Sequence, residues 1–273
     1  MAVSPTERLL HGPWHPLGMN CLVVGAGAMG RWFADTVDAD PTFVDVDPAA
    51  AEAAAAAVGG RAAPADDPPT AEVVCVAVPM PAAGEAVAAY ADRATEAVVD
   101  VTGAMAGPLS AMREHASNLE RLSLHPLFAP ERAPGRVAAV VDAEGPTTDA
   151  VVADLEAAGN DLLWTTAAEH DRAMESVQTA AHAAVLAYAL AVEDVPTAFH
   201  TPVSRRLAEA AEMVVGGESR VYADVQATFD GADAVAAAAA DLAAADREAF
   251  VELYERAGEG WSDGATADGG ADE

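Results

Sequence analysis

The stretch that decides the fold is Cys21-Leu22-Val23-Val24-Gly25-Ala26-Gly27-Ala28-Met29-Gly30. Its first four residues are apolar without alternation, which is typical of a strand buried on both faces, and a Gly-x-Gly-x-x-Gly motif follows where a helix would start. In that context the first glycine allows a tight turn, the second leaves room for a pyrophosphate, and the third lets the helix pack against the strand. The stretch therefore predicts a dinucleotide site whose backbone N–H groups face the phosphates, built from Gly25, Ala26, Gly27, Ala28, Met29 and Gly30.

Strands and helices alternate outward from this stretch as far as residue 166. Continuous Val-rich runs indicate strands covered on both faces, and hence a parallel sheet. The sequence predicts an α/β fold that begins with a Rossmann doubly wound parallel sheet over residues 19–166. The expected strands are 21–24, 42–46, 73–78, 97–101, 137–141 and 162–165, with helices over 28–37 and 48–58.

From residue 167 to 258 the pattern becomes Ala-rich and helical, which predicts a C-terminal all-helical domain. The expected helices are 169–192, 202–215, 220–229 and 232–258. Because such helices expose narrow apolar faces, we expect this domain to pair two copies into a homodimer. The domain is also expected to bind substrate. Residues 1–18 are expected to be an N-terminal extension, and 259–273 a disordered acidic tail.

The charge of the chain is strongly one-sided, with 44 acidic residues against 14 basic ones. This sign excludes a nucleic-acid binder. Because the charge runs along the whole chain, we expect a halophilic protein whose acidic surface suits high salt, and the alternative is an Ala-rich acidic mesophilic protein. The longest uncharged apolar run, 179–192, is too short to span a bilayer, and no secretory leader is evident, so we expect a cytoplasmic protein with no membrane partner.

The two cysteines, Cys21 and Cys75, lie inside apolar strand-like runs. They are expected to be small buried hydrophobic residues and neither a disulfide nor a metal pair. Neither a Cys-x-x-Cys nor a His-Glu-x-x-His motif occurs, so no metal site is expected.

Asp45 follows the second predicted strand, twenty residues after Gly25. At that place an acidic side chain accepts hydrogen bonds from the adenosine ribose hydroxyls and repels a 2′-phosphate. The residues after it, Val46, Asp47 and Pro48, include no arginine that would hold such a phosphate. NAD is therefore the expected cofactor, with NADP less favoured.

Two segments carry histidines in positions that indicate chemistry. The first, residues 123–131, contains His125 and lies where strand ends face a nicotinamide. The second begins at Glu169-His170-Asp171 and continues through Gln178 to His182. Spacings of four, three and four place Asp171, Glu175, Gln178 and His182 in one polar stripe of a helix.

These segments resemble the prephenate and arogenate dehydrogenases of tyrosine biosynthesis over residues 19–222. The matching pieces are the residues 23–30 motif, Val99-Asp100-Val101, Gly107-Pro108-Leu109, Leu124-His125-Pro126-Leu127-Phe128, and Glu169-His170-Asp171 with Met174, Gln178 and His182. The resemblance implies NAD-dependent oxidative decarboxylation of prephenate to 4-hydroxyphenylpyruvate by a haloarchaeal-type enzyme. It also implies that His125 is the base, with a pKa suited to that role. The contacts implied are substrate with Glu131, Gln178 and His182, and nicotinamide with Val78 and Pro79.

The chain departs from the family pattern at three positions. Gly103 and Met105 stand where the family has a serine and a lysine, and Met213 stands where it has the arginine that binds a substrate carboxylate. A buried dianionic substrate needs a cation. The expected substitutes are Arg205 and Arg206, and the alternatives are a protonated His182 helped by Arg172, or Arg132.

Other functions on the same two-domain plan stay open at this point. They are arogenate oxidation, an imine or pyrroline-carboxylate reductase, and a nucleotide sensor that has lost its chemistry. The chain has no lysine, which argues against a β-hydroxyacid dehydrogenase, because that class needs a catalytic lysine.

Overall fold

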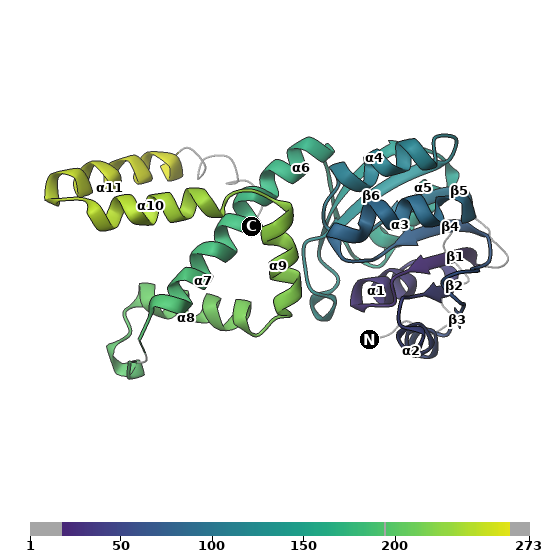
Figure 1. Cartoon of the computed structure of the whole chain (residues 1–273), viewed down its shortest axis with the longest axis horizontal. Coiled ribbons are helices and arrows are strands. Elements are labelled where there is room, and N and C mark those ends of the chain that lie inside the picture. The colour runs from purple at the N-terminus through teal and green to yellow at the C-terminus, as the bar shows by residue number, and fades with distance from the viewer. Residues whose placement is uncertain (1–17, 194, 263–273) are drawn as a thin grey trace. The chain divides into compact units, whose positions relative to one another are not determined.

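The computed structural model describes residues 18–193 and 195–262. The chain divides into two compact units: unit 1 ends at Met174 and unit 2 begins at Glu175 (Figure 1). The helical region starts at Ala167, as the sequence indicates, but its first helix belongs to unit 1. The expected N-terminal extension and acidic tail lie outside the described residues, apart from Gly18 and residues 259–262.

Unit 1 is built on one eight-stranded sheet with the order β3-β2-β1-β4-β5-β6-β7-β8. The first six of these strands along the sheet run parallel, which confirms the doubly wound Rossmann fold. The strands are β1 Met19–Val24, β2 Ala39–Val44, β3 Arg61–Ala62, β4 Ala71–Val76, β5 Ala94–Asp100, β6 Glu120–Pro126, β7 Arg136–Ala143 and β8 Asp161–Trp164.

One pair breaks the parallel pattern, because β7 runs antiparallel to β6. Only residues 127–135 connect the two strands, and a parallel connection needs a longer crossover. Two strands, β3 and β6, were not expected from the sequence. β6 mixes Glu120, Arg121 and Ser123 with its leucines, so it lacks the apolar run that marks the other central strands.

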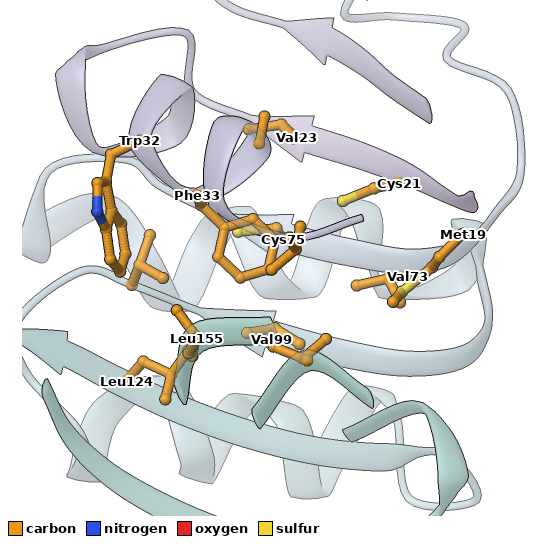
Figure 2. Packing of buried hydrophobic residues seen from close by; sticks show 14 of the residues in the cluster. Met19, Cys21, Val23, Trp32, Phe33, Val73, Cys75, Val99, Leu124 and Leu155 are labelled. Carbon is orange, nitrogen blue, oxygen red and sulfur yellow. The ribbon is translucent and has the colours of Figure 1, made fainter. Parts of the chain in front are cut away.

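Helices cover both faces of the sheet. Alternate residues of each strand point to opposite sides, so Cys21 and Val23 pack with α1 (Ala28–Thr36), α2 (Pro48–Val58) and α5 (Pro146–Ala157) (Figure 2). Leu22 and Val24 belong instead to the cluster that contains α3 (Ala83–Tyr90) and α4 (Ala106–His115). This division gives a sheet with a separate apolar core on each face.

Local signals explain where α2 begins and ends. Asp47 precedes the helix and its side chain accepts a hydrogen bond from the Ala49 N–H, while Pro48 occupies the first helical position. Gly59 ends the helix with a φ of +84°, in the left-handed region that favours glycine. The helix spans the residues that the sequence predicts, 48–58.

Cys21 and Cys75 lie within the first core cluster, as expected from their apolar surroundings. Their relative exposures are 1% and 0%, and neither forms a disulfide. Burial raises the pKa of the Cys21 thiol to about 12 and raises the pKa of the Cys75 thiol well above its usual value.

All regular secondary structure in the described part of unit 2 is helical. It contains a π-helical turn at Glu175–Ala180, followed by α7 (Ala181–Ala191), α8 (Pro202–Val215), α9 (Ser219–Thr228), α10 (Ala232–Ala244) and α11 (Arg247–Ser262). The prediction of a single helix over 232–258 is therefore wrong. Ala245 adopts an extended conformation, and Asp246 accepts hydrogen bonds from the N–H groups of Glu248 and Ala249, which starts a new helix.

The single helix expected over 169–192 is also wrong. It is divided into α6 (Ala167–Met174), the π-helical turn and α7. The turn has a wider repeat than an α-helix, so spacings of four, three and four no longer hold side chains in line. The polar stripe expected from Asp171 to His182 is consequently not formed.

Within the described residues, no helix is long and apolar enough to cross a membrane. The same residues contain no group of three or more His, Cys, Asp or Glu side chains that could hold a metal ion.

Candidate active site

The glycine motif after β1 has the shape that a dinucleotide pyrophosphate requires. Gly25 has a φ of +102°, and a Cβ on it would lie 2.7 Å from the Ala77 carbonyl carbon. A Cβ on Gly30 would overlap the Gly25 carbonyl oxygen, so the helix packs too closely for a side chain. Gly27 differs, because a Cβ there would meet no heavy atom within 4 Å. Two glycines are required by the fold, and the third leaves open space at the start of α1.

Asp45 lies one residue beyond β2 and touches this motif directly. Its Oδ2 accepts a hydrogen bond from the Ala26 N–H at 2.8 Å, and its Oδ1 accepts one from the Asp47 N–H at 3.0 Å. The carboxylate therefore braces the glycine loop and is half-buried beside it. Val78, half-buried, and Pro79, exposed, follow the carboxyl end of β4 on the same sheet.

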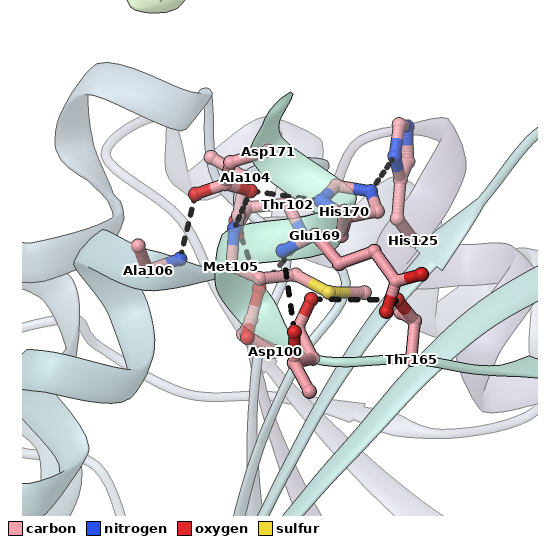
Figure 3. A network of polar contacts seen from close by, with 11 residues as sticks. Asp100, Thr102, Ala104, Met105, Ala106, His125, Thr165, Glu169, His170 and Asp171 are labelled. Carbon is pink, nitrogen blue, oxygen red and sulfur yellow. Dashed lines mark hydrogen bonds and ion pairs between the residues drawn. The ribbon is translucent and has the colours of Figure 1, made fainter. Parts of the chain in front are cut away.

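His125 lies at the carboxyl end of β6, and two residues of α6 form a chain of hydrogen bonds with it (Figure 3). Its Nδ1 is 2.9 Å from Nε2 of His170, and Nδ1 of His170 is 2.8 Å from an Asp171 oxygen. Asp171 in turn accepts hydrogen bonds from the N–H groups of Met105 and Ala106, both at 3.0 Å. The histidine is thus connected to the N-terminus of α4.

The protonation state of this chain follows from its surroundings. Burial, and then the neighbouring His170, lowers the pKa of His125 to about 3, although Asp171 opposes the shift. Burial raises the pKa of Asp171, but the hydrogen bonds from His170 and from the α4 backbone outweigh it, so that pKa lies below its usual value. At neutral pH His125 is therefore a neutral imidazole, linked through His170 to the Asp171 carboxylate. Its pKa of about 3 lies well below the value near working pH that was expected for the base.

Position 103, where the related family has a serine, faces the ring of His125. A Cβ on Gly103 would lie 3.3 Å from Nε2 of His125, and the φ of Gly103 is +99°. A side chain at this position would be both strained and in contact with the imidazole. Met105, where the family has a lysine, is fully buried in the second core cluster with Leu109 and Met112.

Asp100 is a buried carboxylate at the carboxyl end of β5, paired in register with Ser123 of β6. Its Oδ1 accepts hydrogen bonds from the Thr102 N–H at 3.1 Å and from the Thr102 hydroxyl at 2.8 Å. Burial raises the pKa of Asp100 to about 7, against the lowering effects of Ser123 and Thr102. This group therefore titrates near neutral pH inside the fold.

Asp100→Asn is expected to stabilise the protein more at pH 8 than at pH 5. The folded pKa of about 7 exceeds the ordinary value of 3.8, so the wild-type protein loses stability as pH rises through this window. Between pH 5 and the folded pKa this corresponds to at most about 3 kcal/mol. Thermal melts of both proteins at the two pH values measure the effect, with Glu96→Gln, an exposed residue of β5, as the control. A gain that is equal at both pH values would contradict the expectation.

The remaining candidate residues are distributed between the two units. Glu131 is exposed in a short 3₁₀ turn of unit 1. In unit 2, Gln178 is half-buried in the π-helical turn, and His182 is half-buried in α7 with its ring edge against Tyr222, 4.8 Å between centroids. Arg205 and Arg206 are exposed on α8, the helix that also carries Met213.

Sequence analysis did not identify His170, Asp171 and Asp100 as site residues. The segment Glu169-His170-Asp171 was singled out, but no role was predicted for His170, because its contact with His125 joins positions 45 apart in the chain. Asp100 carried a weak signal, since it is the single charged residue at the end of an apolar strand.

Comparisons with known proteins place the chain among dehydrogenases. No protein-family model matches it. The "4-amino-4-deoxyprephenate dehydrogenase" of Streptomyces pristinaespiralis is 34% identical over 237 residues, which cover 78% of this chain and 79% of that protein. Prephenate dehydrogenase of A. aeolicus has the same fold, with a TM-score of 0.66, 15% identity, and coverage of 92% of this chain and 98% of that one.

Synechocystis arogenate dehydrogenase also shares the fold, with a TM-score of 0.58 at 17% identity, covering 90% of this chain and 94% of that one. The identity to the Streptomyces protein, together with its coverage of both chains, shows the family. This chain belongs to the prephenate and arogenate dehydrogenase family of oxidoreductases.

Proposed function

We propose that this chain catalyses the NAD-dependent oxidative decarboxylation of prephenate to 4-hydroxyphenylpyruvate, a step of tyrosine biosynthesis. The observation that carries the proposal is the neutral, buried His125 at the same carboxyl edge of the sheet as the open glycine loop. Cofactor and substrate meet at that edge in doubly wound sheets. The A. aeolicus structure with the same fold holds hydroxyphenyl propionate and NAD+, which supports both parts of the proposal.

Each group of the site has a task in this reaction. Bound NAD supplies the acceptor for the hydride that leaves the ring carbon carrying the hydroxyl. His125 takes the hydroxyl proton as that hydride leaves, and returns a proton to the ring oxygen once loss of CO2 has made the ring aromatic. The open space at Gly27 and the N–H groups at the start of α1 would hold the pyrophosphate, and Val78 and Pro79 would lie beside the nicotinamide.

A second candidate substrate is 4-amino-4-deoxyprephenate, which has an amine where prephenate has the ring hydroxyl. The printed name of the Streptomyces relative favours it. The same base would then remove a proton from nitrogen instead of oxygen.

Steady-state kinetics on three substrates test the proposal. Prephenate, arogenate and 4-amino-4-deoxyprephenate are supplied with NAD or NADP in molar KCl, and reduced cofactor and CO2 are both measured. We expect the highest kcat/KM with prephenate and NAD. A tenfold preference for another substrate would reassign the enzyme to it, and turnover of none would favour a nucleotide sensor. Oxidation of NADH by a cyclic imine would favour a reductase.

Asp45 is expected to set the choice between NAD and NADP. Asp45→Ser removes the carboxylate that would bind the ribose hydroxyls, so kcat/KM for NAD should fall and its advantage over NADP should narrow by about tenfold, on the scale of one charge-assisted hydrogen bond. Asp45→Asn keeps an acceptor for the Ala26 N–H and separates loss of charge from loss of the loop contact. Asp47→Asn is the matched control. A wild-type enzyme that already prefers NADP would refute this role.

Arg206 is expected to meet a substrate carboxylate in place of the family arginine at position 213. It lies seven residues before Met213 on α8, which is close to two helical turns, so the two share a face. Arg206→Met should raise the substrate KM at least tenfold with NAD affinity unchanged, the loss expected for a charge-assisted hydrogen bond of about 1.5–3 kcal/mol. Arg205→Met tests its neighbour, and Arg247→Met, an exposed arginine of α11, is the control.

The alternative cation is His182. Burial lowers the pKa of His182, which disfavours its charged form and weighs toward arginine. If KM is unchanged in both arginine variants and instead rises with pH through the histidine range, His182 binds the carboxylate.

We further propose that unit 2 pairs two copies of the chain. Large apolar side chains on α7 and α8 are exposed in a single copy, among them Leu190 at 88% and Val203 at 69%. Light scattering behind size exclusion in molar KCl should give twice the chain mass of 27.7 kDa. A monomer at micromolar concentration would reject this assembly.

A further inference from the structure

We propose that His170 and Asp171 are positioning residues that hold His125 in the tautomer protonated on Nδ1, so that Nε2 is its basic atom. The proposal deepens the proposed function and rests on it for the role of His125. The relay takes the orienting task that the missing hydroxyl at position 103 would otherwise have.

The direction of each hydrogen bond follows from the carboxylate at the far end of the chain. Asp171 already accepts two backbone N–H groups of α4, and an ionised carboxylate only accepts. His170 therefore donates to it through Nδ1. We assign His170 a single ring proton, which its hydrogen bond to Asp171 places on Nδ1, so Nε2 of His170 is the acceptor. The hydrogen bond of 2.9 Å to His125 is then donated by Nδ1 of His125.

This tautomer leaves Nε2 of His125 without a proton on the edge of the ring that faces Gly103. A Cβ on Gly103 would lie 3.3 Å from that nitrogen, and the positive φ of the residue strains any side chain there. A serine at position 103 is thus not available to orient the ring from the Nε2 edge. The orientation is fixed from the Nδ1 edge, by residues of α6.

The relay also supplies negative charge when His125 takes a proton. The cation formed would be buried, because only 9% of His125 is exposed, and burial alone disfavours it. Asp171 lies on the far side of His170 and favours the protonated form of His125. The two histidine ring planes are inclined at 77°, with their centroids 5.1 Å apart. His170 therefore fixes the orientation of the His125 ring and also accepts the hydrogen bond from its Nδ1–H.

Two variants of His170 distinguish a role in orienting His125 from a role in packing alone. His170→Leu cannot accept a hydrogen bond, and should lower kcat by about 10- to 100-fold with KM and NAD affinity unchanged, the range for lost outer partners of a functional histidine. His170→Gln offers an amide oxygen to Nδ1–H and should recover most of that loss. Asp171→Asn should lower kcat in the same way. His115→Leu, an exposed histidine of α4, should have wild-type kinetics.

A second measurement reads the tautomer directly and needs no substrate. ¹⁵N spectra of the histidine-labelled wild-type protein with NAD, assigned by comparison with His125→Asn, should show His125 protonated on Nδ1 and not on Nε2. Protonation on Nε2, or an unchanged kcat in His170→Leu, would overturn the proposal. If the spectra show the Nδ1 proton and none of the three substrates is turned over, the proposed function fails while the relay stands.

Discussion

His125→Asn is expected to lose at least about a hundredfold in kcat while its affinity for NAD stays unchanged, the usual scale for a lost general base. Asparagine cannot take a proton, yet its amide can still donate a hydrogen bond to His170. Because His125 is buried and neutral in the wild type, the exchange introduces no change of charge. Steady-state kinetics at saturating prephenate, with NAD titrated separately, measure the two quantities.

His115→Asn provides the control for this substitution, because it changes an exposed histidine of the same unit. Its kcat should equal that of the wild type. A His125→Asn enzyme whose kcat stays within threefold of wild type would show that another group takes the proton.

Thermal stability is expected to rise steeply with salt concentration. The formal net charge is −30, from 44 acidic residues against 14 basic ones. Like charges repel over a Debye length of about 10 Å at 0.1 M salt but only about 3 Å at 1 M. Several kcal/mol of repulsion would thus be screened, which corresponds to a rise in Tm of about 10 °C or more for a chain of this size.

Melts in KCl from 0.1 M to above 1 M measure this rise, and a sucrose series serves as the control, because sucrose stabilises folded proteins without screening charge. Arginine ion pairs at the surface, such as Arg61 with Asp40, weaken in salt and act against the rise, but the chain has 14 basic residues to pair with its 44 acidic ones. A flat Tm would favour the Ala-rich acidic mesophilic protein over the halophile that we propose.

The parts of the fold with local signals were predictable from the sequence. The strand and glycine motif at residues 21–30 determine the Rossmann topology, and α2 and α8 have the expected ends because Asp47, Thr201 and the prolines after them mark where helices begin. β6 was missed for a physical reason. Its Arg121 is compensated by an ion pair with Asp142 of β7, which no hydropathy pattern reveals.

Candidate site residues could be predicted only where a single residue type at a given position of the fold indicates a single role. Gly27 and Asp45 belong to that class, as does the histidine at the end of a sheet strand. The partners of His125 do not, because His170 reaches it only after α6 has packed on α4 and β6 has found its place in the sheet. The π-helical turn at Glu175–Ala180 has no residue pattern that marks it, and it broke the stripe that regular helical spacing predicted.

The two buried cysteines are natural probes for opening of the central sheet. Cys21 in β1 and Cys75 in β4 lie on neighbouring strands at the centre of the fold, and their thiols are neither exposed nor ionised in the native state. A disulfide reagent can modify them only when the strands separate, so the labelling rate measures how often that happens. Occupancy of the glycine loop at the end of β1 should slow the labelling by a factor that grows exponentially with the free energy that binding adds to the closed sheet.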